Sequence, residues 1–348
     1  MYFRLPKTQN EIVENHGGEM MEETELLRTL TKLDHCIGVS GDEKNVAELI
    51  KEEMEGLYDV YTEDALGSQY YIKYGRNRER KLLYAAHMDE VGFIVSYIEE
   101  DGFIRFLPVG YHDDGMAINQ ELVIKTAEGG FVYGVTGAKP RHLLSEEARG
   151  KAQKIEDLFL DIGTGSREEA LRLGVNAGDY IAFAKKGHVL NNGSYYMGKS
   201  VDNRVGCAAL IETMRRFKGA EPESTIAAVF SVQEEVGLRS GGPMMNNMDP
   251  DVMLAIDVTM TGDIPGMEKR QSPQEMGKGP SINFYDWDPE LGATGNNVPR
   301  KLTNAIVKIA ESEGIPYQRD VVMGGGTDAW GAAMAGKGYL AGGISIKR

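Results

Sequence analysis

The chain has 348 residues, which is enough for one large domain, or for a main domain that carries an insertion, around a substantial buried core. Hydrophobic residues make up 41% and charged residues 26%, as in ordinary soluble globular proteins, and no run of about 18 apolar residues could span a bilayer. The net charge of -15 would repel a phosphate backbone, so we expect no nucleic-acid partner.

The cysteines and the first residues indicate a cellular compartment. Cys36 and Cys207 lie far apart and form no CxxC pair, so neither a disulfide scaffold nor a thiolate zinc site is indicated. Residues 1–20 are polar and lack the apolar stretch of a signal peptide. We therefore expect a cytoplasmic protein in which residues 1–20 form a loosely ordered leader and the fold begins near residue 21.

Two amphipathic helices are predicted at the start of the fold. Leu26, Leu30 and Leu33 recur at helical spacing, and Ile50 and Met54 belong to a second set with the same spacing. Strand patterns follow these helices. A near-continuous apolar run after residue 80 is typical of a buried central strand, and this strand would end near His87.

The pattern then changes from residue 93 to residue 193, where short strands separated by glycine predict a small β-rich domain. Helices and strands alternate again afterwards, so the β-rich segment is expected to be an insertion. The predicted fold is α/β. A mixed sheet flanked by helices would be formed by a discontinuous domain of residues 21–92 and 194–348, with residues 93–193 as the inserted domain.

Imidazole and carboxylate side chains follow several predicted strands, where α/β sheets usually carry functional groups. These residues are His87, Asp89, Asp202, Glu234, Glu235 and Asp257. In an extended chain the side chains of His87 and Asp89 share one face. Asp89 can therefore hydrogen-bond the imidazole nitrogen that does not bind a metal.

Each carboxylate also has an ordinary structural explanation. Asp202 precedes a predicted helix and could be its N-cap, although a carboxylate there can also bridge two cations. Glu234 and Glu235 could form an exposed acidic turn, and Asp257 could be a turn residue. Together they favour a metal site, because consecutive carboxylates after an apolar strand are costly to bury without cations.

A ligand set of histidine and carboxylates suits a pair of zinc, cobalt or manganese ions. Such ions polarise a carbonyl and lower the pKa of water, while a free glutamate takes the proton of the water. The sequence has no GxSxG segment, and neither cysteine has an adjacent histidine motif. Amide hydrolysis without a covalent intermediate is therefore expected.

Five segments, AAHMDEVGF, GKSVDNRVG, VQEEVG, AIDVT and GGGTDA, occur in an order and spacing that resemble the M42 metallo-aminopeptidases, a family of tetrahedral and glutamyl aminopeptidases. The resemblance covers residues 21–348. It implies a metallopeptidase-type fold, activity on peptides, and two divalent ions per subunit, with zinc or cobalt expected first and manganese as a further candidate. It also implies that the β insertion is a dimerisation domain and that the subunits form a hollow dodecamer.

The resemblance further implies a role for each site residue. One ion would be held by His87, Asp202 and Asp257, and a second by Asp202 and Glu235. Glu234 would be the general base, and Asp89 would hydrogen-bond the imidazole of His87 from behind. Thr327 and Asp328 would lie near the substrate pocket.

One ligand of the family pattern has no counterpart in these residues. The family places a histidine a few residues after the strand at 344–346, whereas no histidine follows His188. A longer protein, a truncated product or a variant with a defective metal site would each account for this. We favour the first, because the sequence breaks off inside a strand-like segment, and we expect the intact protein to continue with a nearby histidine.

Two other functions compete with the aminopeptidase. Some members of the family carry endoglucanase labels, and a glycoside hydrolase could use Glu234 and Glu235 as its carboxylate pair. That chemistry needs no metal and leaves His87 without a role. A glycoside hydrolase would also be expected to have open aromatic platforms for the sugar, but Trp287 and Trp330 are the only tryptophans in the sequence. A catalytically inactive member is the second alternative. The presence of Glu234, which the expected ligand set does not need, argues against it.

Overall fold

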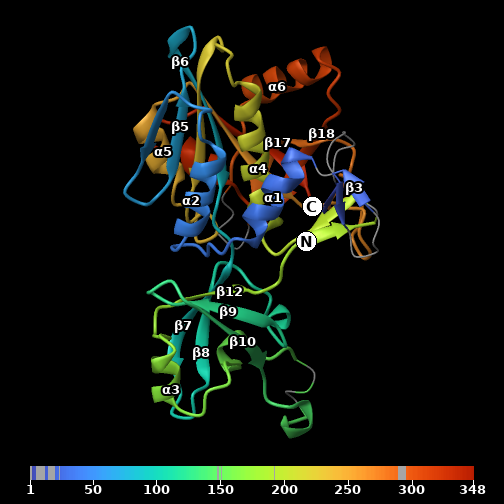
Figure 1. Ribbon diagram of the computed structural model, residues 1–348. Helices are drawn as coiled ribbons and strands as arrows, with labels where there is room; N and C mark the ends of the chain where they lie inside the picture. Colours follow the sequence, from blue (N-terminus) through green and yellow to red (C-terminus); the bar gives the residue numbers. More distant parts are fainter. Residues whose placement is uncertain are drawn as a thin grey trace. The chain divides into compact units, whose positions relative to one another are not determined.

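The computed structural model of the chain describes residues 24–146, 149, 151–191, 193–288 and 295–348, and the backbone of three short strands before residue 24 (Figure 1). The rest of the predicted leader lies outside the described residues. The chain divides into a main unit of residues 1–36, 43–88 and 187–348 and a small unit of residues 37–42 and 89–186. No helix in the described ranges is long and apolar enough to cross a membrane.

A mixed sheet forms the centre of the main unit. Its strands among the described residues, in spatial order, are β18 (Gln318–Met323), β17 (Ser281–Trp287), β19 (Ala341–Lys347), β16 (Val252–Thr259), β6 (Asn77–His87), β15 (Ser224–Ser231), β5 (Gln69–Lys73) and β4 (Val60–Glu63). The predicted central strand is confirmed, because β6 runs parallel to β15 on one side and to β16 on the other. Ser231 lies beside His87, so the carboxyl ends of these strands meet at one edge of the sheet.

Helices cover both faces of this sheet. Those of the main unit are α1 (Glu25–His35), α2 (Lys44–Glu53), α4 (Val201–Arg216), α5 (Gly241–Met248), α6 (Arg300–Ser312) and α7 (Asp328–Ala333). The two predicted amphipathic helices at the start of the fold correspond to α1 and α2. The first is capped by Thr24, whose hydroxyl accepts a hydrogen bond from the N–H of Leu27 at 3.1 Å.

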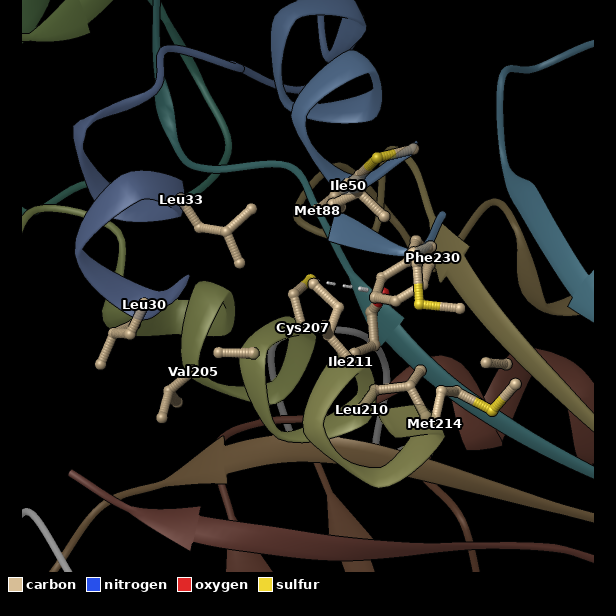
Figure 2. Close-up of a cluster of buried hydrophobic side chains, with 14 of the residues drawn as sticks. Leu30, Leu33, Ile50, Met88, Val205, Cys207, Leu210, Ile211, Met214 and Phe230 are labelled. Carbon is tan, nitrogen blue, oxygen red and sulfur yellow. Dashed lines mark hydrogen bonds between the residues drawn. The ribbon is translucent and has the colours of Figure 1, made fainter. Parts of the chain in front are cut away.

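Alternate residues of the central strands face different helical layers, as the period of a strand requires. Ala86 and Phe230 belong to one core with residues of α1, α2 and α4, and Figure 2 shows Cys207 of α4 within this cluster. Ala85 and Val229, their neighbours in sequence, belong to a second core with residues of α5 and α7. Each large side chain that is fully buried in these cores contributes about 1.5–3 kcal/mol. The position of the sheet edge is therefore fixed from both faces.

The small unit is a closed antiparallel barrel. Its strands among the described residues are β7 (Gly92–Ile98), β8 (Ile104–Val109), β9 (Glu121–Lys125), β10 (Phe131–Gly137), β11 (Phe159–Asp161) and β12 (Tyr180–Phe183), with α3 (Arg167–Arg172) in the same unit. The rings of Phe93 and Phe106 pack edge to face inside it, with centroids 5.0 Å apart. The dimerisation role that we expect for residues 93–193 stays a prediction.

The remaining strands are short. They are β1 (Tyr2–Arg4), β2 (Ile12–Glu14), β3 (Met20–Glu22), β13 (His188–Leu190) and β14 (Tyr195–Met197). β14 pairs with β1 and β13, and β2 pairs with β3.

Two elements of the main sheet and its covering helices, α5 and β17, were not predicted from the sequence. α5 contains glycine, proline and asparagine, which are poor helix formers, but it buries Met244, Met245 and Met248 against the sheet. Its proline stands in the first turn, where the missing N–H is tolerated. β17 has an irregular register with β18 and lies in a glycine-rich region. In both cases tertiary packing outweighs the local preference.

β17 carries a buried carboxyl group, Asp286, whose side chain is 2% exposed. Among the described residues its Oδ1 atom has no hydrogen-bond partner. Burial, together with the negative charges of Asp320 and Asp257, raises its pKa to about 7. Asp320 is itself paired with Lys347, 2.9 Å away.

This buried carboxyl predicts a pH dependence of stability. Because the pKa of Asp286 rises from 3.8 to about 7 on folding, the native state keeps a proton that the unfolded chain loses across this interval. The free energy of unfolding should therefore fall as pH rises from 3.8 to about 7. Asp286→Asn should remove this fall and stabilise the chain at pH above 7 by up to about 4 kcal/mol.

Urea unfolding of metal-stripped protein at acidic and alkaline pH measures the effect. Asp249→Asn is the control, because Asp249 is exposed and occupies a left-handed backbone position that asparagine accepts. If both variants raised the free energy of unfolding equally at alkaline pH, the prediction would be contradicted.

Candidate metal centre

The six residues singled out from the sequence come from four places in the chain. His87 is the last residue of β6, Glu234 and Glu235 follow β15, and Asp257 lies near the carboxyl end of β16. Because these three strands are neighbours and parallel, their carboxyl ends place these side chains at the same edge. Asp202 joins them from the first turn of α4.

The imidazole of His87 is the centre of the cluster. Its Nε2 atom lies 3.1 Å from Oδ1 of Asp202, 3.7 Å from Oδ1 of Asp257 and 3.9 Å from Oε2 of Glu234. The possible ligand atoms form two overlapping groups, His87 with Glu234 and Asp257, and His87 with Asp202 and Glu235. Within each group these atoms lie within 4.8 Å of one another.

The turn that carries the two glutamates is held by a residue outside the sequence prediction. Gln233 adopts a left-handed backbone with φ of 55°, and its N–H donates a hydrogen bond of 3.1 Å to the buried carboxylate of Glu43. This contact ties the turn to the beginning of α2. Glu234 becomes buried and Glu235 half-buried.

Like charges dominate the electrostatics of the cluster. Burial raises the pKa of Glu234 well above its usual value, and the charges of Asp257, Glu235 and Asp328 raise it further, although His87 partly opposes them. Burial also raises the pKa of Asp257. These carboxyl groups therefore lack sufficient positive charge around them in the protein alone.

Asp202 has a different environment. Burial by itself would raise its pKa, but the adjacent Arg348 and His87 lower the pKa below the ordinary value. Arg348 follows β19 and pairs with the second carboxylate oxygen of Asp202. The sequence prediction missed this cation, because only the pairing of β19 with β16 brings it to the site.

The residues fit a divalent cation. They offer an imidazole nitrogen and several carboxylate oxygens within reach of one another, which suits zinc, cobalt or manganese and needs no thiolate. A cation would also compensate the buried negative charge that raises the pKa of Glu234 and Asp257.

Asp89 and the GGGTDA segment lie in different parts of the molecule. Asp89 belongs to the small unit, where it is fully buried and accepts a hydrogen bond of 2.6 Å from the hydroxyl of Ser40. Its contact with the imidazole of His87 stays a prediction. Asp328 begins α7 and accepts a hydrogen bond of 2.6 Å from the hydroxyl of Ser231, at the end of β15.

Other positions next to the site were missed because they look like core residues. Cys207 is buried in α4, and its thiol donates a weak hydrogen bond of 3.2 Å to the carbonyl oxygen of His87. Asn203 is also buried there and contacts the strand that carries Asp257. The sequence gives no signal for either contact, because each joins α4 to a strand that lies far away in the chain.

Comparison with known proteins gives consistent results. The family model described as M42 glutamyl aminopeptidase matches residues 67–348. A lysyl aminopeptidase of Pyrococcus furiosus is 32% identical over 83% of this chain and 79% of its own length. A TET aminopeptidase from the archaeon Thaumarchaeota archaeon SCGC AB-539-E09 superposes with a TM-score of 0.87 at 36% identity, over 93% of this chain and 88% of its own. The Pyrococcus horikoshii TET1 peptidase can assemble into a tetrahedron or a large octahedral shell. It superposes with a TM-score of 0.79 at 33% identity, over 92% of this chain and 91% of its own.

The cluster predicts that metal binding stabilises the fold. At a free zinc concentration 100 times the dissociation constant, the metal-stripped protein should gain about 2.7 kcal/mol against unfolding. His87→Ala should abolish most of this gain, because both possible ligand groups contain this imidazole. Urea unfolding with and without zinc measures the difference.

His188→Ala is the matched control, since His188 lies on β13 and belongs to neither ligand group. The His188→Ala variant should keep the full zinc-induced gain in the free energy of unfolding. A zinc-induced gain in His87→Ala as large as that of the unaltered protein would rule out a site centred on His87.

Proposed function

Because this chain belongs to the M42 glutamyl aminopeptidase family, we propose that it releases amino-terminal residues from peptides with two divalent metal ions and a glutamate general base. The observation that carries the proposal is the cluster of carboxylates around the single imidazole of His87 at the edge of the sheet. The resemblance of the sequence motifs assigns a role to every residue of this cluster.

The proposed ligands are His87, Asp202, Glu235 and Asp257. Asp202 would be shared between the two ions, and His87 and Asp257 would complete one of the two sites. Asp89 would orient the imidazole of His87. Divalent ions held there would polarise the peptide carbonyl and lower the pKa of water. Zinc and cobalt are the first candidates and manganese is a further one.

Glu234 is the proposed general base. It is buried beside His87, and burial raises the pKa of this carboxyl above its usual value, which makes its carboxylate a stronger base than that of an exposed glutamate. Glu234 takes a proton from water as the water oxygen bonds to the peptide carbonyl carbon. It then delivers that proton to the departing amine nitrogen as the carbon–nitrogen bond breaks. The water oxygen remains in the new carboxylate.

The excess of carboxylates favours a substrate with a positive amino terminus. The family is described as glutamyl aminopeptidase, whereas the Pyrococcus furiosus relative is named a lysyl aminopeptidase. These names indicate that similar chains differ in the residue that they release. Homo-oligomers are proposed for this chain because the Pyrococcus horikoshii relative assembles into shells. We also propose that twelve copies of this chain form a dodecamer and that the protein is cytoplasmic.

The substrate class can be tested with peptides and their N-acetylated counterparts. Metal-stripped protein should release glutamate, lysine or leucine from free-amine peptides only after cobalt or zinc is added, because a free ammonium group is the feature that the acidic site favours. Acetylation should lower the rate by at least about 100-fold, as expected for an interaction of about 3 kcal/mol in the transition state.

Cellodextrins in the same panel test the glycoside hydrolase alternative. Hydrolysis of cellodextrins in the presence of chelator would favour that alternative, since a carboxylate pair needs no metal. Absence of cleavage with every metal would favour a catalytically inactive member of the family.

The role of Glu234 predicts a separation of catalysis from metal binding. Glu234→Gln should lower kcat by about 100- to 10,000-fold, because the amide cannot accept the proton of water, while zinc affinity should change little. The neighbouring variant Glu235→Gln should lower zinc affinity itself. Kinetics at saturating zinc and calorimetric titration with zinc measure the two effects. A Glu234→Gln protein with more than about a tenth of the original kcat would exclude a general base at this position.

A further inference from the structure

Asn203 connects two segments of the metal centre. It follows Asp202 directly and is fully buried at the start of α4. Its Nδ2 atom donates a hydrogen bond of 2.8 Å to the carbonyl oxygen of Ile256, the residue before Asp257. A single side chain therefore links the backbone beside one predicted ligand to the backbone beside another.

The other end of this amide is also engaged. Oδ1 of Asn203 accepts a hydrogen bond of 3.1 Å from the N–H of Gly206. The amide can therefore have only one orientation, with its nitrogen toward β16 and its oxygen toward α4. No other side chain of this size supplies a donor and an acceptor in this arrangement, since aspartate lacks the donor and leucine lacks both.

Gly206 supplies the space for this contact. A Cβ atom at this position would lie 2.2 Å from Oδ1 of Asn203 and 2.7 Å from the carbonyl oxygen of Ile256. Glycine inside a helix is less stable than alanine by about 0.5–1 kcal/mol. The close approach of β16, Asn203 and α4 gives a physical reason for glycine at this position.

The backbone at Asp202 and Asn203 departs from helical geometry. Asp202 has φ of -78° and ψ of 111°, and Asn203 has φ of -118° and ψ of 37°, so neither residue is helical. The regular hydrogen bonds of α4 therefore do not fix the direction of the Asp202 carboxylate. The buried amide of Asn203 provides a fixed contact at this point.

We propose that Asn203 is a positioning residue of the metal centre, which sets the placement of the Asp202 and Asp257 carboxylates relative to each other. Gly206 takes part by leaving room for the amide. This inference rests on the proposed function, because it assumes that both aspartates bind metal. Asn203 acts through the two segments that it joins.

A cobalt titration separates this role from a contribution to folding alone. Cobalt(II) is added to metal-stripped protein, and its visible absorption reports both the affinity and the coordination geometry. Asn203→Ala should lower cobalt affinity by about 10- to 100-fold and alter the absorption spectrum at saturation, as is typical for residues that support metal ligands. Gly206→Ala should shift both quantities in the same direction, because its methyl group displaces the amide.

Asn296→Ala is the matched control. Asn296 is also buried and also donates from Nδ2 to a backbone carbonyl oxygen, that of Ala341 at 3.3 Å, but its bond does not join segments that carry predicted ligands. It should bind cobalt within about twofold of the unaltered protein, as expected for an independent site. Thermal unfolding of the metal-stripped variants records the loss of stability separately.

The outcomes distinguish the inference from the proposed function. An unaltered protein that binds no cobalt would overturn both. An unaltered protein that binds cobalt, with Asn203→Ala and Gly206→Ala showing the same affinity and spectrum, would overturn the positioning role alone. If Asn203→Ala does not fold, Gly206→Ala decides the question, because it keeps both hydrogen-bonding groups of the amide and the helix preference of alanine partly offsets the close contacts of its methyl group.

Discussion

The burial of several carboxylates around one imidazole is the constraint on which the main unit depends. Glu234 and Asp257 are nearly inaccessible to water, and burial raises the pKa of both groups. Such an arrangement is unfavourable in a protein interior unless positive charge balances it. Arg348 partly supplies that charge at Asp202. A divalent cation, as in the proposed function, would supply the rest.

The hydrophobic core is what makes this concentration of charge possible. β6, β15 and β16 are buried parallel strands, so their side chains pack against helices on both faces and their carboxyl ends are held at one edge. α4 contributes to the core and to the site. Its apolar residues pack against residues of the sheet (Figure 2), and its first turn carries Asp202 and Asn203. The packing free energy of the core therefore also supports the placement of the charged groups.

The sequence predicted much of the fold and of the candidate site. Apolar runs identified β6, β15 and β16, and the polar residues at their ends identified His87, Glu234 and Asp257, because a strand end is where such residues are informative. α5 and β17 escaped prediction because glycine, proline and asparagine oppose regular structure unless tertiary contacts compensate. Arg348, Asn203 and Cys207 escaped because their site contacts are with residues at least 50 positions away.

The sequence by itself determined the α/β class, the predominance of acidic charge, and the kinds of side chain available as ligands, because composition and periodicity are local properties. It also determined the family through five ordered motifs. Only the tertiary structure decided which oxygen atoms approach Nε2 of His87, and that Asn203 joins the segments of Asp202 and Asp257. These distances follow from the register of parallel strands and from the docking of α4, which depend on contacts between residues far apart in the chain.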